Sequence, residues 1–485
     1  MKNTKQPNAC CQNGLFRGAL IMRLVTFFVS LLAASVFAGE KPNVLFIMVD
    51  DLNADVGFLG DETAKTPNMD WLAEQGTVFA NAHCQAPICG PSRNSLLTGI
   101  YPHNTGLYGL DPLFREVDEL KELTALPQLF RKNGYACPSI GKIYHTKRDP
   151  ESFDKFYGWF GAFGPHPEKP FHLDPDLPVH PFYDWGPYLT VPETADGQIA
   201  QKAVELIKES AGSDQPFFLS VGFFRPHCPL YAPQQWFDAH PLDSVEPVTD
   251  QSEDMSDISA YAKKLVNYDV RQEYSEWLRD GRTASFLQAY RACVSFADHC
   301  VGQVLDALEE SGQADNTIIV LCGDHGVQNG RKNLWYKRTL WNASTQVALL
   351  IKAPGQKPRR IQAPAGLIDI YPTLCELADL TPPQKLDGLS LVGLMQGQKE
   401  KRPPALTSHG PGNFSLRDEH WHYIRYADGS EELYDHRTDP DERTNLVGKP
   451  KSAEVIGRFK PFVPTQSKPF APGSKGIFSG AFPGK

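Results

Sequence analysis

The stretch NVLFIMVDD at residues 43–51 is an unbroken apolar run that ends in two aspartates. Runs of this kind are typical of strands buried on both faces of a parallel sheet. Further strands are predicted at residues 137–143, 217–224, 317–322 and 347–351, and helical patterns occupy residues 68–76, 125–134, 194–211 and 283–311 between them. This alternation predicts an α/β fold with a doubly wound sheet flanked by helices.

The two ends of the chain differ from this pattern. After about residue 400, residues 420–425 and 431–434 predict antiparallel strands joined by a turn at Asp428-Gly429. We therefore expect a leader and signal peptide at residues 1–38, a catalytic α/β domain at residues 39–400, and a smaller C-terminal α+β subdomain at residues 401–485. The Pro- and Gly-rich tail from Pro461 is expected to be loosely ordered.

Composition and leader restrict the classes of function. The chain has 485 residues, of which 22% are charged and 41% hydrophobic, as in ordinary globular proteins. A net charge of −9 argues against nucleic-acid binding, which needs a basic face. Residues 22–38 resemble a secretory signal, although an uncleaved anchor is the alternative. We expect an exported protein, periplasmic or extracellular (lysosomal in a eukaryote), with no membrane segment after cleavage.

The chain contains ten cysteines, and Cys10 and Cys11 would leave with the leader. The eight that remain show none of the paired spacings typical of zinc sites. One or two disulfides are compatible with their number, and the sequence does not determine which cysteines would pair.

Acids and histidines follow several of the predicted strands. Asp50 and Asp51 end the first, His145 and His227 follow two others, and Asp324-His325 follows a fourth. Ligands of open parallel sheets bind at the carboxyl ends of the strands, so these groups are expected to meet. An acidic pair alone is more often a turn or a helix cap. Three carboxylates brought together would repel unless a hard cation such as Ca²⁺ or Mg²⁺ lay between them.

A second stretch, Cys89-Gly90-Pro91-Ser92-Arg93, predicts a loop that runs into a helix, because Pro91 suits a first helical position. Cys89 would then lie just before a helix N-terminus, where an anion is favoured. Arg93, one turn later, can reach back toward it. Either Cys89 is a buried cysteine at a helix cap, or it is a thiolate nucleophile.

Residues 89–99, read as Cys-x-Pro-Ser-Arg-x-x-x-Leu-Thr-Gly, resemble the signature of the type I (formylglycine-dependent) sulfatases. Three further segments resemble family segments in the family's order: Gly141–His145, Arg225–His227 and Trp335–Leu340. His325, where asparagine is commoner, resembles the iduronate-2-sulfatase branch. The similarity covers roughly residues 40 to 450 and implies an alkaline-phosphatase-like fold.

The resemblance implies that a formylglycine-generating enzyme converts Cys89 to formylglycine, an aldehyde whose hydrate is the nucleophile. It also implies one Ca²⁺ per site, with the ligands Asp50, Asp51, Cys89 (as formylglycine), Asp324 and His325.

The resemblance further implies the roles of six catalytic positions, counting Cys89. Arg93 and Lys142 would hold the oxygens of the hydrate, and Lys337 with His227 would bind the sulfate. His227 or Lys337 would protonate the leaving alcohol as general acid. His145 would deprotonate the second hydroxyl so that sulfate is expelled.

The implied substrate is a sulfated carbohydrate, in the closest branch a sulfated uronic-acid glycan. The irregular insertion at residues 160–192 supplies candidate sugar contacts, which are His172, His180, Tyr183 and Trp185. Two alternatives are left open. One is a phosphonate or phosphodiester hydrolase of the same superfamily, and the other is a sulfated-glycan-binding relative whose cysteine is never converted.

Overall fold

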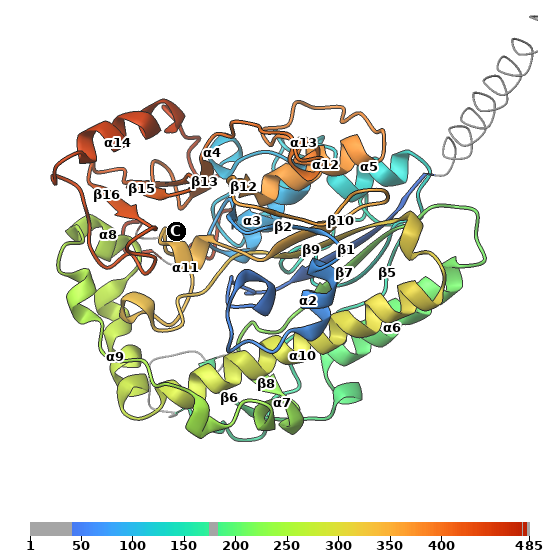
Figure 1. Ribbon diagram of the computed structural model, residues 1–485, viewed down its shortest axis with the longest axis horizontal. Helices are drawn as coiled ribbons and strands as arrows, with labels where there is room; N and C mark the ends of the chain where they lie inside the picture. Colours follow the sequence, from blue (N-terminus) through green and yellow to red (C-terminus); the bar gives the residue numbers. More distant parts are fainter. Residues whose placement is uncertain (1–40, 174–182, 478, 483–485) are drawn as a thin grey trace, which may run out of the picture. The chain divides into compact units, whose positions relative to one another are not determined.

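A mixed eight-stranded sheet forms the centre of the computed structural model, which describes residues 41–173, 183–477 and 479–482 (Figure 1). In spatial order its strands are β11 (Arg359–Ile361), β2 (Thr77–Phe79), β10 (Leu349–Lys352), β9 (Thr317–Gly323), β1 (Asn43–Val49), β7 (Phe218–Phe223), β4 (Pro138–Gly141) and β5 (Lys155–Phe156). Paired strands are parallel except that β10 is antiparallel to both β9 and β2. The predicted α/β class is confirmed, and the reversed β10 makes the sheet mixed.

Helices cover both faces of this sheet, as the alternation of β1 requires. Leu45, Ile47 and Val49 pack into one core together with α10 (Thr283–Glu310) and α6 (Ala195–Ser210). Val44, Phe46 and Met48 face a second core with α3 (Cys89–Thr98), α5 (Leu126–Lys132) and α12 (Ile370–Leu377). Figure 1 shows the two layers on opposite sides of the strands. A strand buried on both faces explains why β1 reads as a continuous apolar run.

The remaining elements of the catalytic part are short. The helices are α2 (Pro67–Ala73), α4 (Pro102–Thr105), α7 (Gln234–Asp238), α8 (Ala260–Leu265), α9 (Tyr268–Arg279), α11 (Asn342–Thr345) and α13 (Val392–Met395). Two small parallel sheets pair β3 (Ala82–His83) with β12 (Ala365–Gly366), and β6 (Trp185–Pro187) with β8 (Leu230–Ala232).

A four-stranded antiparallel sheet follows, made of β13 (Ala405–Ser408), β14 (Phe414–Arg417), β15 (Trp421–Arg425) and β16 (Glu431–Asp435). Helix α14 (Ser452–Phe459) packs on it through Phe459, whose ring centroid lies 5.6 Å from that of Tyr423. The predicted strand pair and its turn are confirmed. This sheet and the central sheet belong to one compact unit, and that unit runs from Asn43 to Lys485.

The described part of the tail is attached to the catalytic part, which differs from the loosely ordered tail expected from its composition. The Lys468 amide donates to the His103 carbonyl at 2.8 Å, and the Ala471 amide donates to the Gly106 carbonyl at 2.9 Å. Phe470 packs edge-on against Tyr108, with 5.3 Å between ring centroids. Backbone pairing to a distant segment fixes this tail, and composition alone does not reveal such pairing.

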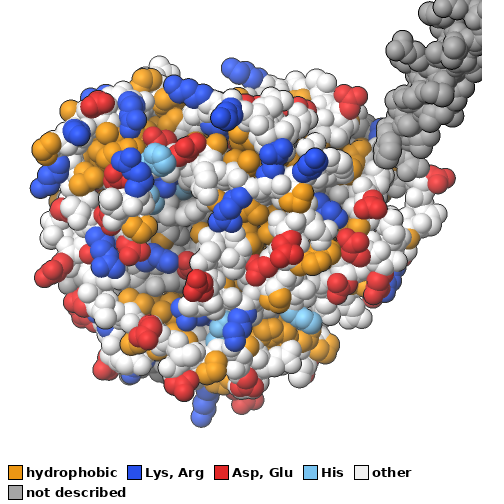
Figure 2. All heavy atoms as spheres, viewed as in Figure 1, with side chains coloured by type: hydrophobic (Ala, Val, Ile, Leu, Met, Phe, Trp, Pro, Cys, Tyr) orange, Lys and Arg blue, Asp and Glu red, His pale blue; other side chains and the backbone are white. Residues whose placement is uncertain are grey.

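The leader lies outside the described residues. Within the residues that the structure describes, no helix has the length and apolar character needed to cross a bilayer. All eight cysteines in that part are free thiols, seven of them buried and Cys228 half-buried. Figure 2 shows acidic and basic side chains interspersed over the face in view.

A glycine in β7 lets the backbone that follows β4 approach closely. A Cβ atom at Gly222 in β7 would overlap the backbone of Lys142, which follows β4. The Lys142 amide donates to the Gly222 carbonyl at 2.9 Å. Because β7 lies between β4 and β1, this close approach lets the Lys142 side chain reach Asp50 at the end of β1.

Candidate active site

The acids predicted to meet at the carboxyl ends of the strands do so. Asp50 and Asp51 follow β1, and Asp324 and His325 follow the neighbouring β9. All four are buried, and the Asp51 amide donates to Asp324 Oδ1 at 3.0 Å. Asp51 adopts a positive φ of 61°, a strained conformation for a residue other than glycine. This strained residue lies where the end of β1 contacts the end of β9.

Cys89 begins α3 from the same edge, after the extended residue Ile88. Three cationic groups surround its sulfur: His325 Nε2 at 3.2 Å, Lys337 Nζ at 3.3 Å and Lys142 Nζ at 3.7 Å. Burial raises the pKa of the thiol, but these positive charges outweigh it and hold the pKa well below its usual value. The site therefore stabilises an anion at position 89.

Each carboxylate of the cluster is paired with a long cation. Arg93 contacts two of them, with Nη2 at 3.0 Å from Asp50 Oδ1 and Nε at 2.8 Å from Asp324 Oδ2. Lys142 also pairs with Asp50, and Lys337 Nζ lies 2.6 Å from Asp51 Oδ1. Strong pairing is required here, because an unpaired buried charge is costly.

Burial and charge shift the titration of this cluster in opposite directions. Burial raises the pKa of Asp324 to about 6, although the Arg93 charge opposes this. For His325 burial lowers the pKa, but the Asp324 charge outweighs it and the result is about 9. For Asp50 burial is outweighed by Lys142, His227 and Arg93, which hold its pKa well below the usual range. Perturbed groups gathered in this way are typical of active sites.

Four residues of the cluster can offer one ligand atom each to a metal ion. They are Asp50, Asp51, Cys89 and His325, and their candidate ligand atoms all lie within 4.8 Å of one another. Asp324 Oδ1 lies 3.5 Å from His325 Nε2, at the edge of the same group. The residues predicted from the sequence as metal ligands are thus brought together.

A pocket of about 1000 Å³ opens above this cluster. Asp51, His145, His227 and Lys337 line it together with aromatic side chains. His227 Nδ1 donates to the Cys228 carbonyl at 2.5 Å, and its ring lies 4.6 Å from that of Phe163. Among the described residues no hydrogen-bond partner is found for the buried Nδ1 of His145. Burial lowers the pKa of His145, whose side chain also hydrogen-bonds Cys89.

The four candidate sugar contacts lie in different places. Tyr183 lines the pocket. His172 is exposed and stacks on Trp185, with 4.7 Å between ring centroids. Trp185 itself is only 1% exposed and packs on Phe286, so it lies within the core cluster. His180 falls outside the described residues.

The pocket also contains residues that the sequence did not reveal. Arg271 comes from α9, and Arg338 directly follows Lys337. Phe163 and Tyr336 form parts of the aromatic wall. The sequence contained one signal for these residues, the run from Trp335 to Arg338. In this run Arg338 is a second cation beside Lys337, the lysine of the family segment.

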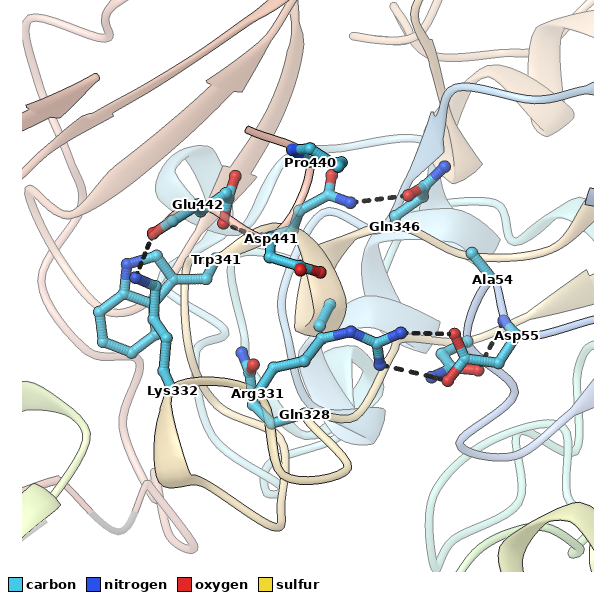
Figure 3. A pocket seen from close by; sticks show the side chains of 13 residues that line it. Ala54, Asp55, Gln328, Arg331, Lys332, Trp341, Gln346, Pro440, Asp441 and Glu442 are labelled. Atoms are coloured by element: carbon cyan, nitrogen blue, oxygen red, sulfur yellow. Dashed lines mark hydrogen bonds and ion pairs between the residues drawn. The ribbon is translucent and has the colours of Figure 1, made fainter. Parts of the chain in front are cut away.

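A second, smaller pocket of about 190 Å³ is lined by both the catalytic part and the C-terminal part (Figure 3). Arg331 forms a two-point ion pair with Asp55, at 2.9 and 3.2 Å. Beside it Lys332 donates to the backbone carbonyl of Glu442. The Glu442 side chain accepts the Asn342 amide at 2.8 Å and also contacts His422 and His436.

Comparison with known proteins identifies the family to which this chain belongs. The sequence model of the family described as Sulfatase matches residues 42–380, and the one described as N-sulphoglucosamine sulphohydrolase, C-terminal, matches residues 330–467. A sulfatase of Formosa agariphila is 39% identical over 443 residues, covering 88% of this chain and 87% of that protein. Iduronate 2-sulfatase of Homo sapiens is 30% identical over 386 residues, covering 73% and 67%.

The fold has solved counterparts as well. The phosphonate monoester hydrolase from Silicibacter pomeroyi superposes with a TM-score of 0.72 at 22% identity, covering 87% of this chain and 94% of that one. This likeness shows the alkaline-phosphatase-like fold. The family match over most of the chain shows both family and activity: the protein belongs to the sulfatase family and is a sulfuric ester hydrolase.

Proposed function

We propose that this enzyme removes sulfate from a sulfated glycan, using a formylglycine made from Cys89 by a formylglycine-generating enzyme. One observation carries the proposal. Lys142, Lys337 and His325 surround the sulfur of Cys89, and Lys337 also lines a pocket of about 1000 Å³. The contacts of the thiol mark the space that the oxygens of a hydrated aldehyde would occupy.

The residues fit a single Ca²⁺. Asp50, Asp51 and Asp324 supply carboxylate oxygens, which a hard cation prefers, and His325 supplies a nitrogen. Three buried carboxylates at one sheet edge repel one another, and a divalent cation would stabilise them. When bound, the ion supplies positive charge that acidifies a hydroxyl of residue 89.

The chain's own residues would do the remaining work. Arg93, which two carboxylates already orient, would hold the oxygens of residue 89 together with Lys142. Lys337 and His227 line the pocket and would bind the sulfate oxygens. With Nδ1–H donating to the Cys228 carbonyl, His227 in its imidazolium form would protonate the leaving alcohol through Nε2–H. His145 contacts residue 89 from the other side and would accept the proton of the second hydroxyl.

The proposed substrate class is a sulfated uronic-acid glycan, as in the iduronate 2-sulfatase to which the chain is similar. The presence of a signal-like leader supports export to the periplasm or the extracellular space (lysosome in a eukaryote). We further propose the division into a leader (1–38), a catalytic domain (39–400) and a C-terminal subdomain (401–485).

The first experiment is mass spectrometry of the peptide spanning Cys89, from protein produced with and without a formylglycine-generating enzyme. An aldehyde at position 89 that appears together with sulfatase activity is the expected result. A thiol that persists in active protein would overturn the nucleophile assignment. A thiol in inactive protein that still binds sulfated sugars would favour the glycan-binding alternative.

Metal content tests the ligand assignment separately. The Asp50→Asn variant is expected to lose most of the Ca²⁺ that elemental analysis finds in the native protein. Unchanged calcium would remove Asp50 from the ligand set.

A phosphonate or phosphodiester hydrolase is a second candidate, favoured by the TM-score of 0.72 to a phosphonate monoester hydrolase. Rates on matched aryl sulfate and aryl phosphonate esters distinguish the two. We expect the sulfate ester to react faster.

A further inference from the structure

We propose that Arg338 and Arg271 form a second anion-binding subsite in the active-site pocket, which takes another acidic group of the sugar substrate, a carboxylate or a second sulfate. The inference rests on the proposed sulfatase function and deepens it, because it limits the substrates to saccharides that have an acidic group besides the scissile ester.

Position is the first support. Both arginines line the same pocket as His227 and Lys337. Lys337 Nζ is already committed to the scissile end, at 3.3 Å from Cys89 Sγ and 2.6 Å from Asp51 Oδ1. Arg338 is its neighbour in the chain, and Arg271 reaches the pocket from α9. The two arginines therefore add positive charge beyond that needed for the reacting sulfate.

The side chain of Arg271 is oriented by an aromatic ring. Its guanidinium carbon lies 3.6 Å from the centroid of Tyr336, at cation–π distance. The Tyr336 hydroxyl in turn donates to the Val266 carbonyl at 2.9 Å, which fixes the ring. A guanidinium held flat in this way keeps its edge N–H groups for a planar, two-oxygen partner such as a carboxylate.

The backbone of Arg338 is strained. Its φ is 76°, in the left-handed region, and its amide donates to the Pro87 carbonyl at 3.0 Å. A non-glycine residue in this region is strained, and such residues concentrate at ligand-binding sites. Pro87 lies two residues before Cys89, so the hydrogen bond sets Arg338 against the loop that carries the nucleophile.

The charges of the two arginines also support the proposal. Burial lowers the pKa of Arg338 to about 10, and the positive charge of Arg271 adds to this shift, so the two guanidinium groups repel each other. Arg338 remains charged at neutral pH. An acidic group of the substrate placed between them would relieve this repulsion in a site partly shielded from water. Glu273, which also lines the pocket, is exposed and stands two positions from Arg271 on α9.

The neighbouring wall suits a sugar ring. Tyr183 packs against Tyr274 with the two rings tilted and 5.4 Å between their centroids. Aromatic faces of this kind contact the apolar face of a pyranose, while the arginines would bind its acidic substituent.

The test measures binding rather than turnover, so that it does not depend on maturation. Calorimetry with the full-length Cys89→Ala protein compares two matched pairs of sugars. One pair is a sulfated hexuronate and the corresponding sulfated hexose; the other is a disulfated hexosamine and its monosulfated parent. We expect the second acid of at least one pair to improve the Kd about 10-fold or more, as one charged, two-point contact would.

The same comparison in Arg338→Gln and Arg271→Gln backgrounds locates the effect. We expect each variant to lose most of this discrimination, and Arg338→Lys to keep part of it. Arg282→Gln is the matched control, because Arg282 also lies over an aromatic ring, that of Trp277 at 4.7 Å, but does not line the pocket.

Two results would overturn the proposal: equal affinity for both members of each pair in the parent protein, or equal weakening of both members by the arginine variants. Which pair discriminates shows whether the acid is a carboxylate or a second sulfate. A mature enzyme that hydrolyses no sulfate ester, yet retains arginine-dependent discrimination, would refute the proposed function and leave the subsite standing.

Discussion

Two clusters of possible metal-ligating side chains in this molecule have similar composition but different surroundings. The catalytic cluster contains Asp50, Asp51, Cys89 and His325, and the C-terminal cluster contains His422, His436 and Glu442. In both, the candidate ligand atoms lie within 4.8 Å of one another. Judged by residue types and spacing alone, either cluster qualifies as a metal site.

Their partners differ. In the catalytic cluster the side chains come from two strand ends and a helix start, and one of them, Asp51, lines the pocket of about 1000 Å³. In the C-terminal cluster one carboxylate, Glu442, accepts from both histidines and from the Asn342 amide. Together with Lys332, these contacts tie the C-terminal part to the segment that carries Lys337. A buried cluster serves chemistry when it is open to a ligand, and serves stability when its members satisfy one another.

The largest expected effect is on activity at the catalytic cluster. Cys89→Ala should lower kcat by about 10⁴-fold or more, because no other group can replace the nucleophile. Its melting temperature should stay near that of the parent, since Lys142 and Lys337 keep their carboxylate partners Asp50 and Asp51. Steady-state kinetics measures the loss of kcat, and thermal unfolding measures the melting temperature. Retained activity would refute the role of position 89.

The C-terminal cluster should respond in the opposite way. Glu442→Gln leaves the buried His422 and the half-buried His436 without their carboxylate partner and should cost about 3 kcal/mol of unfolding free energy. Activity per folded molecule should change far less. Chemical denaturation measures the first quantity and an active-site titration the second. Glu454→Gln, at an exposed position on α14, is the matched control and should stay within about 0.5 kcal/mol of the parent.

A smaller and more selective effect is expected at His227. His227→Ala should slow sugar sulfates about 100-fold, the size of a lost general acid, and slow aryl sulfates with good leaving groups less. The slope of log kcat against leaving-group pKa measures the difference. An equal loss across the series would assign His227 to sulfate binding alone.

The smallest effect concerns acid stability. Burial raises the pKa of Glu442, but His422 and His436 outweigh this and hold the pKa well below its usual 4.5. A depressed carboxyl pKa stabilises the fold fully above the unfolded value and progressively less as the pH falls below it. The stability gap between the parent and Glu442→Gln should therefore be constant near neutrality and narrow below about pH 4.5. Melting curves from pH 7 to 3 measure it, and a constant gap would contradict the assignment.

The sequence predicted the parts that obey local rules. Apolar runs revealed β1, β7 and β9, because strands buried on both faces leave no alternation. The acids that end these strands were predicted to meet, and they do. The antiparallel direction of β10 and the attachment of the tail near Gly106 were not predicted, because both depend on contacts between segments far apart in the chain.

The candidate site shows the same division. Cys89 and Arg93 belong to one motif and could be assigned together. Arg271 lies far from every motif and reaches the pocket only because α9 folds beside Tyr336. The packing of Trp185 in the core likewise depends on α10, so a sequence pattern could not distinguish it from an exposed sugar platform.

The eight free thiols have a practical consequence. Within the described residues no disulfide links these thiols, and a reducing cytosol that contains the maturation enzyme would keep them reduced during production. Conversion of Cys89 would remove one thiol from the count. Titration of the denatured protein with a chromogenic thiol reagent would then report the matured fraction of each preparation, because the other cysteines provide a constant internal reference.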